Sequence, residues 1–167
     1  MRLLCARRVA PPSADFNGAW NADEGPRMGF DDTYKLSAHA VITNEAGEVL
    51  QLRATYADKS WGLPGGALDL GETIHEALHR ECREELGREI VIDYLSGVYY
   101  HRVYNSHVFI FRAHLKTHGV GNSNGDITLS SEHSAFDYFA LNDLSPVQRV
   151  RVQHCLQFNG EVQSAKF

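Results

Sequence analysis

Residues 66–87 read GALDLGETIHEALHRECREELG. The first part of this stretch is rich in glycine, and its second part spaces apolar residues at the helical period, so the sequence predicts a loop followed by a helix over residues 73–86. Three carboxylates of this helix, Glu81, Glu84 and Glu85, stand at positions i, i+3 and i+4. Residues at this spacing are neighbours on one side of a helix, so the helix gathers negative charge there.

Part of that charge lies against the apolar side of the predicted helix. On a helical wheel, Glu81 and Glu85 fall inside the apolar arc. The arc consists of Ile74, Ala77, Leu78, Cys82 and Leu86. Dehydrating carboxylates without partners costs several kcal/mol per ion, and neighbouring like charges repel one another. We therefore expect positively charged partners for these glutamates.

Two kinds of partner are available. Arg80 lies beside the acidic residues, and its planar guanidinium can hold a carboxylate in a fixed orientation. One guanidinium cannot balance three carboxylates, whereas divalent cations take hard oxygen ligands of this kind. Oxygen-only ligation favours Mg²⁺ or Mn²⁺ over zinc. The sequence thus predicts a Mg²⁺ (or Mn²⁺) site, and the alternative is an ordinary solvated acidic face.

The same stretch carries a family resemblance. Residues 66–88 resemble the Nudix box, G-x5-E-x7-R-E-U-x-E-E-x-G-U, in which U is a bulky apolar residue. The matching positions are Gly66, Glu72, Arg80, Glu81, Glu84, Glu85 and Gly87. Two U positions depart from the pattern, with Cys82 at the first and Arg88 at the last. The resemblance implies an α+β fold, a Nudix-like α/β/α sandwich with a mixed β-sheet.

The resemblance also implies a reaction and the residues that carry it. Members of the family cleave a phosphoanhydride bond in a nucleoside diphosphate linked to another group, with metals that neutralise phosphate oxygens and activate water. The family's ligand positions map onto the Gly65 carbonyl and the carboxylates of Glu81, Glu84 and Glu85, with Glu72 and Arg80 orienting the cluster. We therefore expect a metal-dependent pyrophosphohydrolase.

Two glutamates are candidates for the catalytic base. Crowding raises the pKa of one carboxylate in such a cluster, so Glu81 could take a proton from water. In this family a glutamate often precedes the last strand, and Glu132 stands shortly before the strand expected at residues 136–141. The sequence leaves the choice between them open.

Aromatic residues suggest where a nucleotide substrate binds. Tyr99 and Tyr104 offer stacking surface, although each could instead belong to a strand core. Tyr104 lies sixteen positions beyond Arg88, where a tyrosine resembles the dinucleoside polyphosphate subgroup. Neither Val103 nor Tyr104 is the proline that would resemble the ADP-ribose subgroup. We expect a nucleoside triphosphate or dinucleoside polyphosphate as the substrate.

Two other functions deserve comparison with this one. His75, Glu76 and His79 form the pattern H-E-x-x-H of zinc hydrolases, but the wheel places both histidines away from Glu81 and Glu85. A match at three positions also arises by chance far more easily than a match at seven. The second alternative is a catalytically inactive Nudix-fold nucleotide sensor, which would have no need for every carboxylate of the motif.

Composition limits the remaining possibilities. The chain has 167 residues, enough for one ordinary domain, and it contains no apolar run long enough to span a bilayer. Its net charge of −5 gives no reason to expect binding to duplex nucleic acid. The cysteines, Cys5, Cys82 and Cys155, are isolated from one another, which is typical of a reducing cytoplasm.

The chain divides into three expected segments. Residues 1–33 read as an irregular extension, residues 34–160 as the Nudix domain, and residues 161–167 as a tail. Residues 1–30 could wrap a partner in a homodimer. Within the domain we expect a hairpin over residues 36–54, strands near 90–103, 107–116 and 136–141, and a polar loop at 119–126. Ser145 followed by Pro146 predicts the start of a second helix that ends near residues 159–160.

Overall fold

The larger sheet of the domain mixes parallel and antiparallel strands. The computed structural model describes residues 32–56, 59–116 and 127–167, and its five-stranded sheet has the order β4-β1-β6-β5-β8. The strands are β1 (Lys35–Val41), β4 (Gly65–Ala67), β5 (Ile90–His101), β6 (Ser106–Leu115) and β8 (Gln163–Lys166). The pairs β1–β6 and β5–β8 are parallel, whereas β1–β4 and β5–β6 are antiparallel. The prediction of a mixed sheet is confirmed.

A smaller sheet contains β2 (Val49–Ala54), β3 (Trp61–Gly62) and β7 (His133–Phe139) in the order β3-β2-β7. The hairpin expected over residues 36–54 is therefore present only at its turn, where Thr43 and Val49 form an isolated antiparallel bridge. Beyond this bridge the two strands enter different sheets. The reason lies in burial: the first four residues of β2 are all buried, so this strand needs packing partners on both faces.

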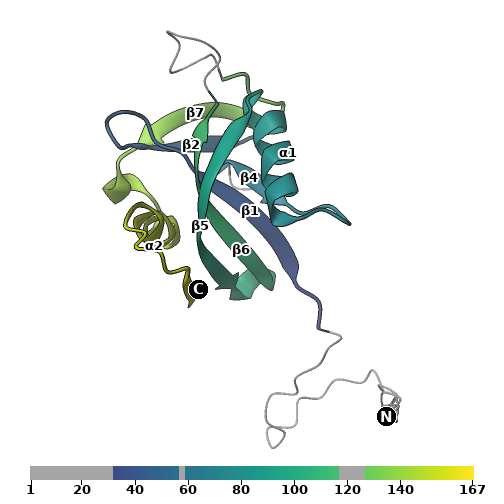
Figure 1. The fold of residues 1–167 in the computed structure, drawn as a ribbon. Helices are drawn as coiled ribbons and strands as arrows, with labels where there is room; N and C mark the ends of the chain where they lie inside the picture. Colours follow the sequence, from purple (N-terminus) through teal and green to yellow (C-terminus); the bar gives the residue numbers. More distant parts are fainter. Residues whose placement is uncertain (1–31, 57–58, 117–126) are drawn as a thin grey trace, which may run out of the picture. The chain divides into compact units, whose positions relative to one another are not determined.

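Two helices cover opposite faces of the five-stranded sheet (Figure 1). They are α1 (Ile74–Leu86) and α2 (Pro146–Leu156), and two short 3₁₀ turns lie at η1 (Arg102–Tyr104) and η2 (Leu141–Asp143). Ala40 and Phe111 pack with α1 in one core cluster, whereas Val108 and Ile110 pack with α2 in the other. Successive residues of a strand point to opposite faces, so β6 supplies both cores. The predicted α/β/α arrangement is confirmed.

Both ends of α1 are specified by local residues. The Thr73 hydroxyl accepts from the Glu76 backbone N–H at 3.2 Å, and the Glu76 carboxylate accepts from the Thr73 N–H at 2.8 Å. At the other end Gly87 adopts a left-handed conformation with φ 62°, and its N–H donates to the Arg83 carbonyl. This capping box and glycine stop agree with the helix predicted from the sequence.

The C-terminal part differs from expectation in two ways. Pro146 does begin α2, but the Ser145 side chain makes no capping hydrogen bond, and the helix ends at Leu156 rather than near residues 159–160. Residues 161–167 are not a free tail, because they contain β8, which pairs with β5. Ala165 and Phe167 pack against the core cluster beside α2, and this burial explains why the segment joins the sheet.

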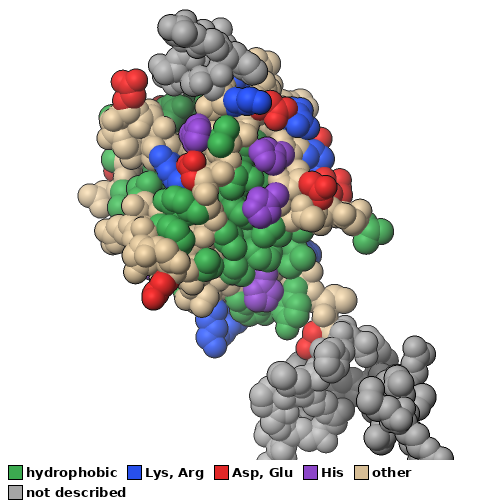
Figure 2. All heavy atoms as spheres, viewed as in Figure 1, with side chains coloured by type: hydrophobic (Ala, Val, Ile, Leu, Met, Phe, Trp, Pro, Cys, Tyr) green, Lys and Arg blue, Asp and Glu red, His purple; other side chains and the backbone are tan. Residues whose placement is uncertain are grey.

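Charged groups on the α1 side gather along the helix. Figure 2 shows apolar side chains over the middle of the strands, with acidic and basic side chains along the margin that α1 forms. None of the helices within the described ranges is long and apolar enough to cross a membrane. The expected irregular extension and the polar loop at residues 119–126 fall outside the described residues, apart from the last two positions of the extension.

Removing residues 161–167 should destabilise the domain, because β5 loses its parallel partner and the core loses the Phe167 ring. Burying an apolar side chain of this size contributes roughly 2 kcal/mol, which corresponds to a fall of about 4–8 °C in Tm for a chain of this length. Thermal unfolding followed by circular dichroism measures the change. The substitution Phe167→Ala separates the ring from the strand pairing, and an unchanged Tm in the truncated chain would contradict the packing described above.

Candidate active site

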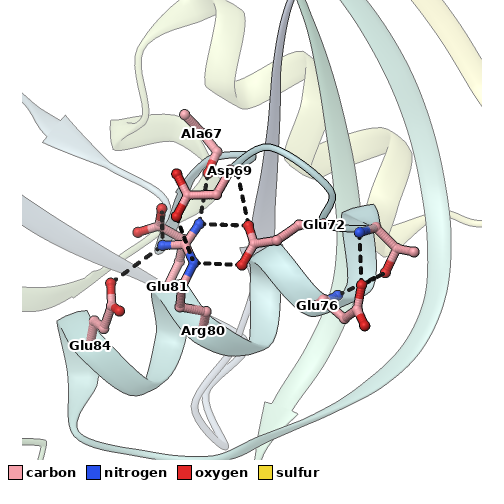
Figure 3. A network of polar contacts seen from close by, with 8 residues as sticks. Ala67, Asp69, Glu72, Glu76, Arg80, Glu81 and Glu84 are labelled. Carbon is pink, nitrogen blue, oxygen red and sulfur yellow. Dashed lines mark hydrogen bonds and ion pairs between the residues drawn. The ribbon is translucent and has the colours of Figure 1, made fainter.

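Arg80 stands at the centre of a carboxylate network between the loop after β4 and α1 (Figure 3). Its Nε and Nη2 atoms donate to the two carboxylate oxygens of Glu72 at 2.8 and 2.9 Å, and Nη2 also donates to the Ala67 carbonyl at 3.0 Å. Its Nη1 atom donates to Glu81 at 2.9 Å and to Glu84 at 3.3 Å. Arg80 therefore clamps one carboxylate through two atoms and shares a single donor atom between two others.

The pair formed by Arg80 and Glu72 is permanently charged. Hydrogen bonds from Arg80, and then from the Asp69 backbone N–H, lower the pKa of Glu72 to about 2. The same contact with Glu72 is the main cause that raises the pKa of Arg80 above its usual value. Because both groups stay ionised at neutral pH, the bidentate contact holds the loop before α1 against the helix.

Glu85 is the deeply buried carboxylate of α1, with only 7% of its surface exposed. Its Oε2 atom accepts from the Gly65 N–H at 2.7 Å, and its Oε1 atom lies 3.6 Å from Nε2 of His133. Burial raises the pKa of Glu85 to about 8, and the charges of Glu81 and Glu132 add to this effect while the Gly65 N–H opposes it. Ionising this group is costly unless a cation lies nearby.

Two glycines let β4 approach both β1 and α1. Gly65 has a φ of 121°, and a Cβ atom there would lie 2.2 Å from the carbonyl oxygen of Ala38. A Cβ atom on Gly66 would lie 2.6 Å from the carboxylate of Glu81. The Glu81 carboxylate therefore occupies the space that a side chain at position 66 would fill. Burial raises the pKa of Glu81, partly offset by hydrogen bonding to Arg80.

Glu132 joins this acidic region from the turn before β7. Its charge contributes to the raised pKa values of both Glu81 and Glu85, so its carboxylate lies within electrostatic reach of them. Its backbone carbonyl accepts from the Thr55 N–H at 2.8 Å, which ties the turn to the end of β2. The fold thus brings the predicted base candidate into the same region as the predicted metal ligands.

The donor atoms of this region suit a hard divalent cation. The carboxylates of Glu81, Glu84 and Glu85 and the Gly65 carbonyl offer oxygen alone, which fits Mg²⁺ better than zinc. In the part of the chain that the structure describes, no three His, Cys, Asp or Glu side chains already converge as a metal cluster. Glu81 and Glu84 turn to Arg80 instead. To bind a cation, Glu81 and Glu84 would have to exchange their hydrogen bonds with Nη1 of Arg80 for bonds to the metal.

A cavity of about 380 Å³ opens beside Glu85. Its walls are formed by His39, Leu52, Ala54, Tyr56, Ser60, Gly62, Leu63, Gly65, Glu85, Tyr104 and His133. Tyr56 and Tyr104 are 59% and 61% exposed, so both rings are open for contact with a ligand. The ring of Tyr104 also packs on that of His101, with 4.7 Å between centroids. Tyr104, predicted as a substrate-binding residue, therefore lines a cavity that adjoins the carboxylates.

Tyr99, the other predicted substrate-binding residue, belongs to the core. Its side chain is fully buried in the cluster beside α2, and its hydroxyl lies 3.0 Å from Nδ1 of His154. Burial raises the pKa of its hydroxyl to about 12. Neighbouring strand residues alternate in direction, so Tyr99 faces α2 and is not among the residues that line the cavity. The prediction that it contacts substrate is wrong in this structure.

The residues of the H-E-x-x-H pattern do not converge with a third His, Cys, Asp or Glu side chain in the described part of the chain. Glu76 is committed to the capping box with Thr73. The His75 ring packs edge-on against Phe111 with 5.0 Å between centroids, which is an ordinary contact at the edge of the core. His79, one turn further along α1, is half-buried.

Sequence reasoning missed three residues of the cavity: His39, Tyr56 and His133. His39 lies on β1, where Nδ1 is 3.3 Å from the Leu63 carbonyl, and burial lowers its pKa to about 4. Burial also lowers the pKa of His133. Nothing in the local sequence marks these residues, because they meet only through the register of β1 with β4 and through the separate sheet that holds β7.

Comparison with known proteins identifies a matching family and several relatives. A family model described as the NUDIX domain matches residues 33–155. A MutT-like protein of Streptomyces ambofaciens is 32% identical over 113 residues, which cover 67% of this chain and 68% of that protein. An RNA pyrophosphohydrolase of Edwardsiella ictaluri is 42% identical over 57 residues, 34% of this chain and 32% of that protein. The chain thus matches only about a third of the length of the RNA pyrophosphohydrolase.

Solved structures share the fold. An ADP-ribose pyrophosphatase from Streptococcus suis superposes with a TM-score of 0.63 at 22% identity, covering 81% of this chain and 100% of that one. An Ap4A hydrolase from C. elegans superposes with a TM-score of 0.61 at 24% identity, covering 74% and 96%. At this level of identity the likeness concerns the architecture.

Gly66→Ala should weaken Mg²⁺ binding while leaving the fold intact. The new methyl group would displace the Glu81 carboxylate, whose side chain is flexible enough to move without disturbing the core. We expect the affinity for Mg²⁺ to fall by about tenfold or more, as for other changes that disturb ligand orientation. Isothermal titration calorimetry measures the affinity, and thermal unfolding checks the fold.

A double-mutant cycle with Glu81→Ala provides the control. If the methyl group acts through the Glu81 carboxylate, Gly66→Ala adds little to the loss already caused by Glu81→Ala. Additive losses would contradict the steric explanation.

Proposed function

This chain belongs to the Nudix hydrolase family, and we propose that it is a Mg²⁺-dependent pyrophosphohydrolase of nucleoside triphosphates or dinucleoside polyphosphates. The observation that carries the metal dependence is the charge imbalance around α1. Arg80 commits two of its donor atoms to Glu72, which leaves one donor atom for both Glu81 and Glu84. The buried Glu85 ionises readily only with a further cation beside it. Phosphates carry negative charge themselves, so an acidic site can take them only with cations in between.

Each residue then has a role that follows from its position. Glu81, Glu84, Glu85 and the Gly65 carbonyl would hold the cation, which when bound neutralises phosphate oxygens and lowers the pKa of water. The Arg80–Glu72 pair holds the loop and the helix in a fixed relation, so that the carboxylates keep their orientation. The Gly65 N–H fixes one oxygen of Glu85, and the other oxygen lies 3.6 Å from Nε2 of His133.

Glu132 is our candidate for the base that accepts a proton from the attacking water. It approaches the acidic region from outside α1, and its carboxylate is exposed, so a water molecule has access to it. Glu81 is the alternative base, but its carboxylate is bound by Arg80 and confined beside Gly66. The placement therefore favours Glu132.

An inactive nucleotide sensor is the main competing function. It would retain the cavity but would have no reason to retain an acidic network whose like charges repel one another. The partial match to RNA pyrophosphohydrolases adds one further substrate to test, a 5′-triphosphate at an RNA end.

We expect Mg²⁺-dependent release of phosphate or pyrophosphate from at least one member of a substrate panel. The panel contains nucleoside triphosphates, dinucleoside polyphosphates, nucleotide sugars, ADP-ribose and a 5′-triphosphorylated RNA oligonucleotide. Chelation by EDTA should abolish turnover, and Glu85→Gln should lower kcat on the order of 100-fold. The matched controls His75→Ala and His79→Ala alter the same helix without touching the carboxylates, and both should retain activity.

Three outcomes of this panel count against the proposal. Absence of turnover on every substrate would favour the sensor. Turnover that persists in EDTA would exclude a requirement for a divalent cation. A bound zinc that is lost in His75→Ala would favour the H-E-x-x-H alternative.

Glu132→Gln should reduce kcat by tenfold or more with little change in KM, because the amide keeps the size of the side chain but cannot accept the proton. The backbone contact between Glu132 and Thr55 does not involve the side chain, so the turn should stay in place. Steady-state kinetics on the substrate found above measures the effect. Near-normal kcat would exclude Glu132 as the base and leave Glu81.

A further inference from the structure

The cavity beside Glu85 is built for an uncharged part of the substrate. Among its lining residues in the described chain there is no lysine and no arginine, and its only ionisable carboxylate is Glu85 at one end. Phosphate groups would meet no cationic side chain there, whereas apolar walls such as Leu52 and Leu63 and the exposed rings of Tyr56 and Tyr104 suit a nucleoside.

His39 presents a hydrogen-bond acceptor to this cavity. Its Nδ1 atom lies 3.3 Å from the Leu63 carbonyl oxygen. A carbonyl can only accept, so Nδ1 must carry the proton and donate it. In a neutral ring the other nitrogen, Nε2, then has no proton and can only accept. The contact with Leu63 thus fixes which of the two nitrogens faces outward as an acceptor.

The Nε2 atom of His39 is also free to receive a ligand. It has no hydrogen-bond partner among the described residues, and it is not one of the polar atoms sealed from solvent, which include Nδ1 of His101 and Nδ1 of His133. His39 and Gly65 are register partners on β1 and β4. His39 therefore lies on the strand next to Gly65, whose N–H donates to Glu85, and all three residues line the same cavity.

We propose that His39 is a specificity-determining residue, whose Nε2 atom accepts a hydrogen bond from an N–H or O–H group of the nucleoside that occupies the cavity. This inference rests on the proposed function. Two parts of a nucleoside carry such donors, the exocyclic amino group of adenine, guanine or cytosine and the hydroxyls of ribose. A site that binds a donor in this way discriminates against an analogue that lacks it, because the acceptor is then left unpaired.

Binding of nucleoside monophosphates tests the inference without hydrolysis, since these compounds contain no phosphoanhydride bond. Isothermal titration calorimetry in the presence of Mg²⁺ compares AMP and GMP with IMP, CMP with UMP, and AMP with its 2′-deoxy and 3′-deoxy forms. We expect the analogue without the recognised donor to bind about tenfold more weakly, the usual effect of losing one hydrogen bond. A loss of affinity in the comparisons of bases identifies the amino group as the donor, and a loss in the comparison with the deoxy forms identifies a ribose hydroxyl.

Variants at position 39 test whether the preference among the monophosphates comes from His39. In His39→Phe the preference should disappear, and in His39→Gln, whose amide oxygen can reach the position of Nε2, part of it should return. His114→Phe is the matched control, because His114 lies on β6 with an exposed ring that contacts Asp93 outside the cavity. The control should keep the preference of the native protein.

A measurement on the native protein does not depend on whether the variants fold. Long-range proton–nitrogen NMR spectra should show His39 with a protonated Nδ1 and an unprotonated Nε2, and AMP should shift the Nε2 signal. A proton on Nε2 in the free protein would overturn the inference, as would a preference that survives in His39→Phe, or equal or undetectable binding of all the monophosphates. If the protein hydrolyses a substrate but shows no preference among the monophosphates, the role of His39 is wrong and the proposed function stands. If it shows the preference but hydrolyses no substrate, the proposed function is wrong and the role of His39 stands.

Discussion

The bidentate ion pair between Arg80 and Glu72 is the contact on which the candidate site depends. A guanidinium offers its donors in a rigid plane, and here both Nε and Nη2 are directed at Glu72. This leaves Nη1 as the donor for both Glu81 and Glu84. The pair therefore fixes the geometry of the loop and the helix without neutralising the site, and the remaining negative charge is what makes a cation site chemically reasonable.

Backbone shape brings that charge to the sheet. Gly65 adopts a φ of 121°, and Gly66 leaves room for the Glu81 carboxylate, so β4 passes closer to α1 than a strand with side chains could. The N–H of Gly65 then reaches Glu85 at 2.7 Å. The capping box at Thr73 fixes where α1 begins, and hence which residues face β4. A few local features thus place carboxylates from one helix against the edge of a sheet.

The parts of the fold that local patterns determine could be predicted from the sequence, whereas the parts that depend on strand register could not. The helical wheel correctly placed Glu81 and Glu85 on the buried side of α1. The separation of β1 from β2 follows from packing on both faces of β2, and β8 joins β5 through its contacts with a distant core. Tyr99 illustrates the same limit, because a one-residue change in strand position decides between core and cavity.

The same dependence on register explains how the half-buried His39 can act on a substrate. The tautomer of a histidine depends on the hydrogen bonds that its ring makes. Pairing β1 with β4 brings His39 beside the Leu63 carbonyl and thereby fixes its outward nitrogen as an acceptor. If both proposals hold, the acidic region of α1 and the neutral cavity beside it bind different parts of one substrate. The carboxylates of α1 meet the phosphates through a cation, and the neutral cavity meets the nucleoside, so one substrate spans both.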